Sequence, residues 1–293
     1  MPAMNFPDHF SRQSTDYAAH RPRYPAELFA WLASLGTRHE RVWDCATGNG
    51  QVAVDLANHF DSVLATDASV AQIRNRHLHE SIDYLVATAE RTPFKDRCCD
   101  LVTVAQAVHW FDFERFYAGV RRIVRPGGVV AVWTYASFHV TDEVDAVVSR
   151  FYSDVVGPFW PPERAYVEAA YRTIPFPFPE MPVPPFECVT RWNVEGLIGY
   201  LRSWSAVQRL RDEQDRGSRV SAAPGARESL GSRGGHSSRE LADPPARRAS
   251  LTPCPSSHIL RAPLIPSGRF QPHKTAKAVP WPTQDPQPRH RTR

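Results

Sequence analysis

The stretch Val42-Trp43-Asp44-Cys45-Ala46-Thr47-Gly48-Asn49-Gly50-Gln51 decides the fold of this chain. It begins as an apolar run, reaches an acid at Asp44 and then turns over small residues, which predicts a strand, a tight loop and a helix start. Gly48 and Gly50 can adopt positive φ and let a ligand approach the backbone closely. The loop is therefore a candidate cofactor site, although a glycine-bearing loop is more often plain turn chemistry.

Outward from this loop, strands and helices alternate. Apolar runs predict strands at 41–45, 62–66, 82–87, 100–105 and 129–133, and apolar spacing predicts helices at 26–35, 51–60, 69–77 and 113–124. Parallel strands need crossovers, which helices usually supply. The predicted fold class is α/β with a doubly wound, mostly parallel sheet. Beyond it we expect a helix at 141–155, a proline and aromatic insertion at 158–185, a strand at 186–192 and a helix at 194–207.

The composition divides the chain into two segments. Residues 1–214 hold 21 Lys and Arg against 26 Asp and Glu, whereas residues 215–293 hold 14 against 5, so that the net charges are −5 and +9. The second segment has 12 of the 27 prolines and only 2 of the 32 aromatic residues, too little apolar surface to offset the entropy of ordering. We predict one compact domain over 1–214 and a disordered basic tail over 215–293.

The remaining composition favours a cytoplasmic protein. The five cysteines lack Cys-x-x-Cys spacing and are odd in number, so neither a zinc site, nor another metal site, nor a disulfide framework is expected. The first ten residues do not resemble a secretory signal, and the most apolar run is too short to cross a bilayer. Scattered cations in the tail are typical of a solvated segment, so we expect no membrane and no specific nucleic-acid partner. The oligomeric state is left open.

An acid follows the next predicted strand. Asp67 lies 17 residues after Gly50, where a carboxylate can accept hydrogen bonds from both hydroxyls of a ribose; a helix cap or a turn acid is the alternative. The sequence has no Gly-x-Gly-x-x-Gly at this loop and no Gly-Lys-Ser/Thr, which disfavours a dinucleotide and excludes a P-loop. A cofactor without a pyrophosphate is therefore favoured.

An ordered set of motifs resembles the class I S-adenosylmethionine-dependent methyltransferases, and among them the type 11 branch that includes trans-aconitate methyltransferase. The set covers about residues 10–210 and comprises YAAHRPRYP at 17–25, DCATGNGQ at 44–51, Asp67, ATAERTPF at 87–94, AQAVHWF at 105–111 and RPGG at 125–128. The resemblance implies S-adenosylmethionine as the cofactor.

The resemblance also implies roles for single residues. Asp44, Ala46, Gly48 and Gly50 would hold the methionine part of the cofactor, with Asp67 on the ribose. Ala89 and Glu90 would lie beside the adenine, and Gln106 would close the pocket. Tyr17 and Arg21 resemble an amino-terminal segment that folds over the cofactor, where a guanidinium could pair with a carboxylate. An exposed polar arm is the alternative for these last two.

Acceptor residues are expected after the fourth strand and in the insertion. His109 is a candidate general base, with a structural histidine as the alternative. Trp110 is a candidate substrate contact or a core residue, and Trp160 and Tyr166 lie in the insertion that we expect to set specificity. A small, partly apolar acceptor is expected; a carboxylate needs no base, whereas a hydroxyl or amine would make His109 more important.

The resemblance stops near Gln214, where family members would continue into one more strand. The chain passes instead into Arg, Pro, Ser and Gly, as an alternative carboxyl terminus or an altered reading frame would produce. Without that strand, the fifth strand would have an open edge and the strand at 186–192 no inner neighbour. The leading prediction is a methyltransferase of small molecules; the alternatives are a cofactor-binding protein without turnover, or a truncated form of the enzyme, and an NAD-dependent oxidoreductase.

Overall fold

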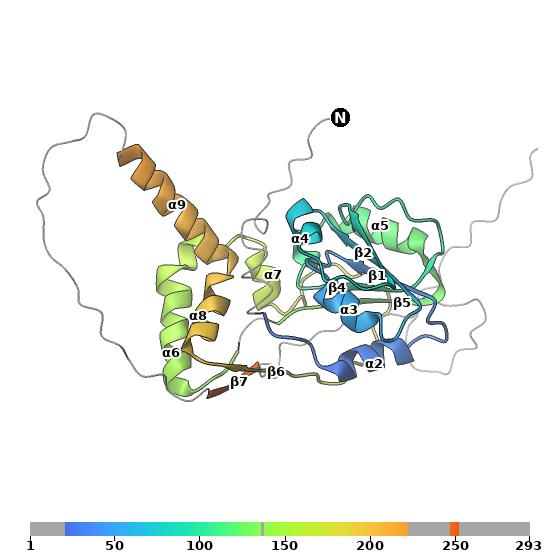
Figure 1. The fold of residues 1–293 in the computed structure, drawn as a ribbon, viewed down its shortest axis with the longest axis horizontal. Helices are drawn as coiled ribbons and strands as arrows, with labels where there is room; N and C mark the ends of the chain where they lie inside the picture. The colour runs from blue at the N-terminus through green and yellow to red at the C-terminus, as the bar shows by residue number, and fades with distance from the viewer. Residues whose placement is uncertain (1–20, 136–137, 222–246, 252–293) are drawn as a thin grey trace, which may run out of the picture.

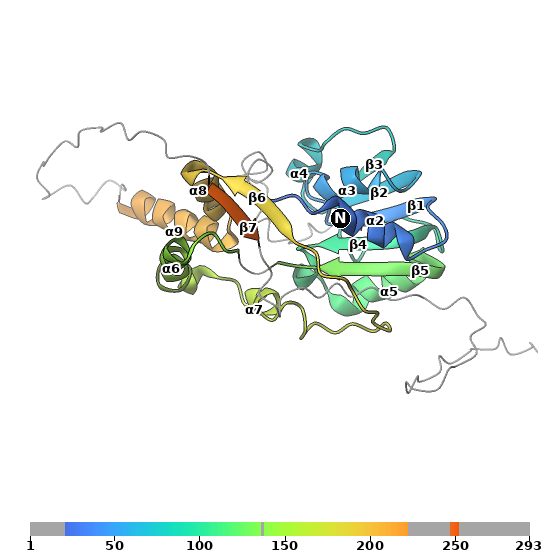
Figure 2. The ribbon, with the colours of Figure 1, turned by 90° about the horizontal axis from the view of Figure 1, so that it is seen from below.

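A five-stranded parallel sheet forms the centre of the molecule. The computed structural model describes residues 21–135, 138–221 and 247–251 (Figure 1). The strands are β1 (Arg41–Cys45), β2 (Ser62–Asp67), β3 (Ile82–Val86), β4 (Cys99–Ala105) and β5 (Val124–Trp133), in the order β3-β2-β1-β4-β5. Figure 2 shows this order with β5 at one edge. Because every pairing is parallel, the carboxyl ends of all five strands lie along one edge of the sheet.

Helices cover both faces, as the doubly wound class requires. The helices α2 (Ala26–Ser34) and α3 (Gln51–Leu56) pack on one face through Phe29, Leu32 and Leu56, and α5 (Phe113–Ile123) packs on the other through Phe116 and Val120 (Figure 1). The short α4 (Val70–Arg74) begins after Ser69, whose hydroxyl accepts from the Gln72 amide at 3.3 Å, as an N-cap does. The predicted fold class is thus confirmed.

The Arg-Pro-Gly-Gly run at 125–128, which follows the helix predicted over 113–124, is part of strand β5. Val124 already pairs with Cys99, the chain bends through Gly127 at φ 82°, and Val129 then pairs with Leu101. The helix predicted over 51–60 is also shorter, because it ends at Leu56 and only turns follow.

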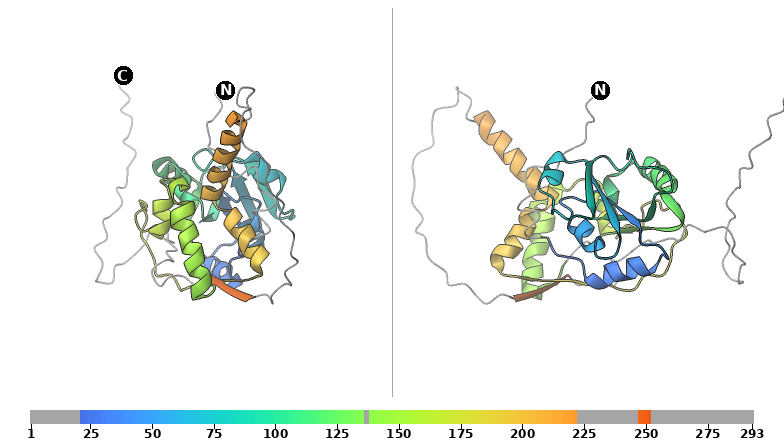
Figure 3. Two further views of the ribbon diagram at one scale, coloured as in Figure 1. Left: turned by 90° about the vertical axis from the view of Figure 1, so that its left-hand side faces the viewer. Right: turned by 45° about the vertical axis from the view of Figure 1, so that its right-hand side comes forward.

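Residues 138–216, together with the end of the last helix, form a smaller helical region beside the sheet, except that Val167, Tyr171 and Ile174 pack in the core of the sheet. Its elements are α6 (Asp142–Arg150), the π-helical turn η3 (Phe151–Val155), the 3₁₀ turn η4 (Gly157–Phe159), α7 (Arg164–Glu168), β6 (Cys188–Trp192), α8 (Val194–Arg202) and α9 (Ser205–Ser221). Figure 3 shows α6, α8 and α9 together on one side of the sheet. The helix predicted over 194–207 is two helices, because the chain turns at Ser203, whose hydroxyl donates to the Tyr200 carbonyl at 2.6 Å.

The carboxyl-terminal part differs from the prediction in two places. The boundary at residue 214 falls inside α9, and β7 (Arg247–Leu251) pairs antiparallel with β6. The strand β6 therefore has a partner, in a separate two-stranded sheet. Among the described residues, no strand pairs with the outer edge of β5. The predicted disorder of the rest of 215–293 lies outside the described residues, which include no helix that is long and apolar enough to cross a membrane.

Candidate cofactor and acceptor site

The quoted loop connects the carboxyl end of β1 to α3. Ala46 at φ 56°, Gly48 at φ 61° and Gly50 at φ 92° all adopt left-handed backbone, which turns the chain sharply at the sheet edge. At Gly50 a side chain is also excluded by space, because an added Cβ would lie 2.0 Å from the Tyr84 hydroxyl oxygen. Gly50 therefore allows the loop to turn, and it is not among the residues that line the clefts described below.

Asp44 is buried at the end of β1 and anchors the loop from below. Its two carboxylate oxygens accept from the Thr47 hydroxyl at 2.5 Å and the Thr103 hydroxyl at 2.8 Å. Burial raises the pKa of Asp44 from 3.8 to about 7, although both hydrogen bonds act in the opposite direction. Proximity to Asp67 adds to the increase. Asp44 is therefore a buried carboxyl group next to the loop that titrates near neutral pH.

Asp67 ties the loop to the end of β2. One carboxylate oxygen accepts from the Gly48 amide at 2.9 Å, and the other accepts from the Ser69 amide at 2.8 Å. A carboxylate has about four acceptor positions, and Asp67 also lines the adjacent cleft. The two interpretations of Asp67, as a helix cap or turn acid and as a ribose-binding residue, are therefore compatible. The same carboxylate can shape the loop and face a ligand.

A cleft lies along the carboxyl ends of β1, β2 and β4. Its open volume is about 810 Å³, which includes space that is open to solvent. Small side chains leave room for a flat ligand on its floor, and the predicted residues among those that line it are Ala46, Gly48, Asp67, Ala89, Glu90, Gln106 and Trp110. A connected recess contains Asp44, Gly48 and Arg21. The structure thus brings together most of the predicted cofactor residues.

Gln106 lies where the cofactor cleft meets a second cavity. It follows β4 in left-handed backbone at φ 58°, and its side-chain oxygen accepts from the Thr134 hydroxyl at 2.8 Å. Its amide nitrogen donates to the Tyr135 carbonyl at 3.4 Å, and the Tyr135 hydroxyl accepts from Arg21 at 3.1 Å. Gln106 and Arg21 therefore border both the recess beside the cleft and the second cavity.

The second cavity, termed here the acceptor cavity, lies between the sheet edge and the helical region. It encloses about 610 Å³ and is walled by aromatic and basic side chains, namely Arg21, His109, Trp110, Tyr135, Trp160, Arg164, Tyr200 and Trp204, with Gln106, Pro161, Val167 and Ser205. The Arg164 guanidinium lies 4.5 Å from the Trp160 ring centroid, and that of Arg21 lies 5.6 Å from the ring of Tyr200. Two cations thus face one aromatic cavity.

His109 is buried in the wall of this cavity. Its Nδ1 lies 2.7 Å from the Tyr171 hydroxyl, and burial lowers the pKa of His109 from 6.5 to about 3, with Arg164 acting in the same direction. The imidazole is therefore neutral at physiological pH and is poorly suited to hold a proton. The sequence left open a general base and a structural histidine; His109 lines the acceptor cavity, and its ring contacts the Tyr171 hydroxyl.

Other predicted residues lie elsewhere. Tyr166 does not line the acceptor cavity, because its ring packs edge-on against Phe113 at 5.6 Å and belongs to the core. Trp160 and Trp110 do line it. Tyr17 lies outside the described residues.

Four aromatic or basic residues of the acceptor cavity were missed in the sequence, namely Tyr135, Arg164, Tyr200 and Trp204. Arg164 lies in the proline and aromatic insertion, whereas the three aromatic residues come from segments outside it. Only Arg164 carried a local signal, because it is a charged residue that lies between Trp160 and Tyr166 in the sequence.

Comparisons with known proteins agree with this geometry. A family model described as a methyltransferase domain matches residues 43–132. A protein of Dictyostelium discoideum described as a methyltransferase is 32% identical over 212 residues, which cover 68% of this chain and 78% of that protein. The structure of a protein described as a type II methyltransferase from Anaeromyxobacter dehalogenans is 39% identical, with a TM-score of 0.66 over 84% of this chain and 98% of that chain.

A shorter match covers about half of a mycobacterial relative. An uncharacterized methyltransferase of Mycobacterium tuberculosis is 36% identical over 120 residues, which cover 40% of this chain and about half, 48%, of that protein. The chain belongs to the class I S-adenosylmethionine-dependent methyltransferase family, and it is an enzyme of that class with S-adenosylmethionine as its cofactor. The comparisons favour neither an NAD-dependent oxidoreductase nor a protein without turnover, and the narrower trans-aconitate branch stays a prediction.

The residues present fit this cofactor. The Asp67 carboxylate faces a cleft with a small-residue floor, and the connected recess places Asp44 and Arg21 where a group that carries both an ammonium and a carboxylate would find opposite charges. These side chains would hold the two ends of S-adenosylmethionine. The roles of single residues remain predictions that the variants described below test.

Proposed function

We propose that this methyltransferase transfers a methyl group to the carboxylate of a small, partly apolar molecule that binds in the acceptor cavity. The observation that carries the proposal is Arg164 in an aromatic cavity directly beside the cofactor cleft, with Arg21 at the border that this cavity shares with the cofactor recess. A guanidinium pairs with a carboxylate through parallel hydrogen bonds, which fixes orientation as well as affinity.

The charge of the cavity favours an anion. Of the described residues that line it, none is acidic, whereas two are arginines. The Arg164 Nε donates to the Tyr152 hydroxyl at 2.9 Å and lies 3.8 Å from the Glu168 carboxylate, and these contacts hold the guanidinium over Trp160. A guanidinium that is held in place loses less entropy when it binds a ligand. The tryptophan and tyrosine rings offer contact surface for the apolar part of the same molecule.

The neutral state of His109 favours the same class of acceptor. A hydroxyl or an ammonium must lose a proton before or during methyl transfer, and a base works best with a pKa near the working pH. The pKa of His109, about 3, is far below that value, whereas a carboxylate is already an anionic nucleophile at pH 7. His109 therefore positions the acceptor by hydrogen bonding rather than by taking its proton.

The protein contributes alignment and exclusion of water. S-adenosylmethionine, when bound, supplies an electrophilic methyl group on a sulfonium, and the displacement requires the nucleophile in line with it. Gln106 and Arg21 border both spaces, so they can orient the acceptor relative to the cofactor. Trp110 borders the cofactor cleft as well as the acceptor cavity and keeps their junction apolar.

The acceptor class can be tested with a matched panel. Small carboxylic acids with apolar or aromatic substituents, and their primary amides, are incubated with the full chain and radiolabelled S-adenosylmethionine. We expect label only from acids, in a product that releases volatile methanol on mild alkaline hydrolysis, as methyl esters do. Methylation of amines or phenols with alkali-stable label, and none of any acid, would contradict the proposal.

The role of Arg164 can be tested in the same assay. Arg164→Gln should lower kcat/KM for the best acid by about 10- to 100-fold, because a charge-assisted hydrogen bond to the acceptor is lost. Arg164→Lys should recover part of it, and the exposed Arg38→Gln serves as the matched control. A variant Arg164→Gln with normal kcat/KM would show that Arg164 does not bind the acceptor.

A further inference from the structure

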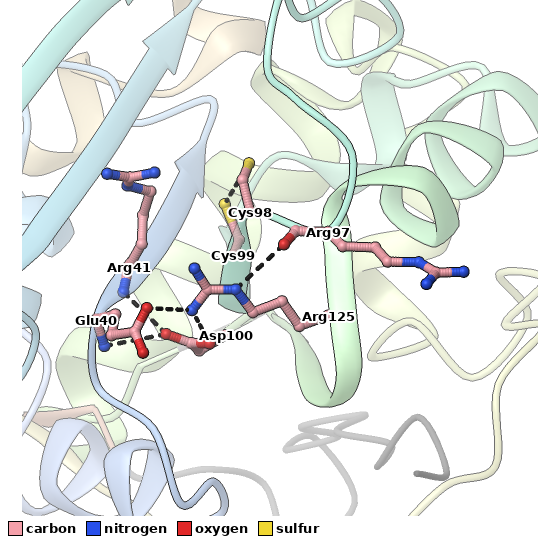
Figure 4. A network of polar contacts seen from close by, with 7 residues as sticks. All are labelled: Glu40, Arg41, Arg97, Cys98, Cys99, Asp100 and Arg125. Carbon is pink, nitrogen blue, oxygen red and sulfur yellow. Dashed lines mark hydrogen bonds and ion pairs between the residues drawn. The ribbon is translucent and has the colours of Figure 1, made fainter. Parts of the chain in front are cut away.

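Two adjacent thiols lie at the opposite end of the sheet from the cofactor cleft. Cys98 precedes β4 and Cys99 begins it, so they lie at the amino ends of the strands, whereas the cleft lies at the carboxyl ends. Their sulfur atoms are 3.6 Å apart (Figure 4). This pair, termed here the vicinal thiols, has no part in methyl transfer.

Local backbone geometry brings the two sulfur atoms together. Neighbouring side chains of a regular strand point to opposite faces. Here Arg97 adopts left-handed backbone at φ 50°, and the pairing of β4 with β5 shifts register between Cys99 and Leu101. The Cys98 amide nevertheless donates to the Ile123 carbonyl at 2.8 Å, which fixes the first thiol against the sheet. The irregular start of β4 thus keeps both thiols on one side.

Nearby charges favour the thiolate of Cys98. The hydrogen bond with Cys99 lowers the pKa of Cys98 to about 6 against the opposing effect of burial, and Arg41 and Arg125 act in the lowering direction. The pKa of Cys99 is raised by the same hydrogen bond and by burial. The Arg125 guanidinium lies close by (Figure 4), and it donates to Asp100 at 2.8 Å and to Glu40 at 2.7 Å.

The two thiols differ in access. Cys98 follows the exposed Arg97 and keeps 7% of its surface accessible, whereas Cys99 is 0% accessible. A small oxidant from solvent would therefore meet Cys98 first. A thiolate beside a second thiol is the arrangement of cysteines that are oxidised reversibly.

We propose that the vicinal thiols are a modification site for hydroperoxides, in which Cys98 is oxidised and Cys99 resolves the product to a Cys98–Cys99 disulfide. The Cys98 thiolate attacks one peroxide oxygen; the S–O bond forms, the O–O bond breaks, and the leaving hydroxide takes a proton to become water. The Cys99 sulfur then attacks the Cys98 sulfenic acid; the S–S bond forms, the S–O bond breaks, and hydroxide leaves with the Cys99 proton as a second water. Hydrogen peroxide is reduced by two electrons, and the two thiols are oxidised by two.

The product should be easily reduced. Adjacent Cα atoms are about 3.8 Å apart across a trans peptide, shorter than the roughly 4.4–6.8 Å usual for disulfides. A bond outside the usual geometry is strained and therefore more reducible. We expect the oxidised form to return to thiols under mild reductant.

Peptide mapping tests the proposal. The full chain, with Cys254→Ser so that oxidation is followed only at described cysteines, is treated with hydrogen peroxide at pH 7, quenched with acid and alkylated under denaturing conditions. We expect Cys98 and Cys99 to lose alkylation together, at least about ten-fold faster than Cys188, whose pKa burial raises to about 12. The peptide should be lighter by two hydrogen atoms, and dithiothreitol should restore alkylation.

Variants separate the two roles. In Cys99→Ser, Cys98 should stop at the sulfenic acid and be trapped by dimedone, whereas Cys98→Ser should leave Cys99 unreactive. Cys188→Ser is the matched control and should react like the parent chain. Oxidation of Cys98 and Cys99 no faster than that of Cys188, or a disulfide of either with another cysteine, would overturn the proposal, as would failure of dimedone to label Cys99→Ser.

Discussion

The sheet region, residues 41–133, and the helical region, residues 138–216, differ in the composition of their cores and in the cavity that each one lines. The sheet has a core of mainly aliphatic side chains around five parallel strands, to which Val167, Tyr171 and Ile174 also contribute. The helical region has an aromatic core in which Tyr200 and Trp204 are central. The cofactor cleft is lined by residues of the sheet region, whereas the acceptor cavity takes most of its aromatic wall from the helical region.

This difference indicates which residues we expect to determine the specificity for the acceptor. Strand ends in a rigid parallel sheet hold Asp44, Asp67 and Gln106 in positions that depend on backbone register. The helical region contributes Trp160, Arg164 and Tyr200, whose side chains line the acceptor cavity and give it its shape and charge. Changes in the two regions should therefore affect different functions, and the following variants test that separation.

The largest expected effect is on the stability of the helical region. Trp204 is buried and its ring contacts those of Phe151, Tyr152, Trp160 and Tyr200, with centroids 5.6–6.3 Å apart. Trp204→Ala should reduce the free energy of unfolding of this region by about 5 kcal/mol, since a large buried ring is lost. Hydrogen exchange should rise in 138–216 and stay unchanged in 41–133. An equal rise in both would show that they unfold as one unit.

Next in size is the pH dependence that Asp44 gives the sheet region. The folded pKa is about 7 and the reference value is 3.8, so between these values the folded state binds a proton that the unfolded state has released. Stability from this group is therefore greatest below pH 4 and falls as pH rises to 7, by about 4 kcal/mol. Denaturant unfolding of the parent chain and Asp44→Asn should show this decline in their difference. A difference that is independent of pH would refute the raised pKa.

A smaller effect is expected at glycines of the sheet region. A Cβ added at Gly128 would lie 2.6 Å from a methyl carbon of Val124 and 2.8 Å from the Asp100 carbonyl oxygen, whereas one at Gly119 would meet nothing within 4 Å. Gly128→Ala should cost about 2 kcal/mol in thermal or denaturant unfolding, because the strand must shift. Gly119→Ala should instead add up to about 1 kcal/mol within helix α5. Equal effects at both positions would contradict the packing described for β5.

Much of the sheet was predictable because buried parallel strands have continuous apolar sequences. The strand at 41–45 agrees residue for residue with β1, and most of the predicted cofactor residues line one cleft because the carboxyl ends of parallel strands meet at one edge. The start of β5 was not predictable, since the Arg-Pro-Gly-Gly run reads as a turn although Val124 pairs with Cys99.

The acceptor cavity could be predicted only in part. Arg21, Trp110 and Arg164 come together from three distant segments, and spacing along the chain carries no signal for such a contact. Tyr166 and Trp160 are both aromatic residues of one insertion, yet only Trp160 reaches the cavity. Their local sequences do not distinguish them, because the direction of each side chain depends on how α7 packs.

Calorimetric titration with S-adenosylhomocysteine tests most directly the central claim that the sheet region binds the cofactor and the helical region binds the acceptor. Asp67→Ala should weaken binding by about 100-fold, since it removes charge-assisted hydrogen bonds to the ribose, whereas Arg164→Gln should bind within about two-fold of the parent chain. Near-normal affinity in Asp67→Ala, or a large loss in Arg164→Gln, would contradict this division.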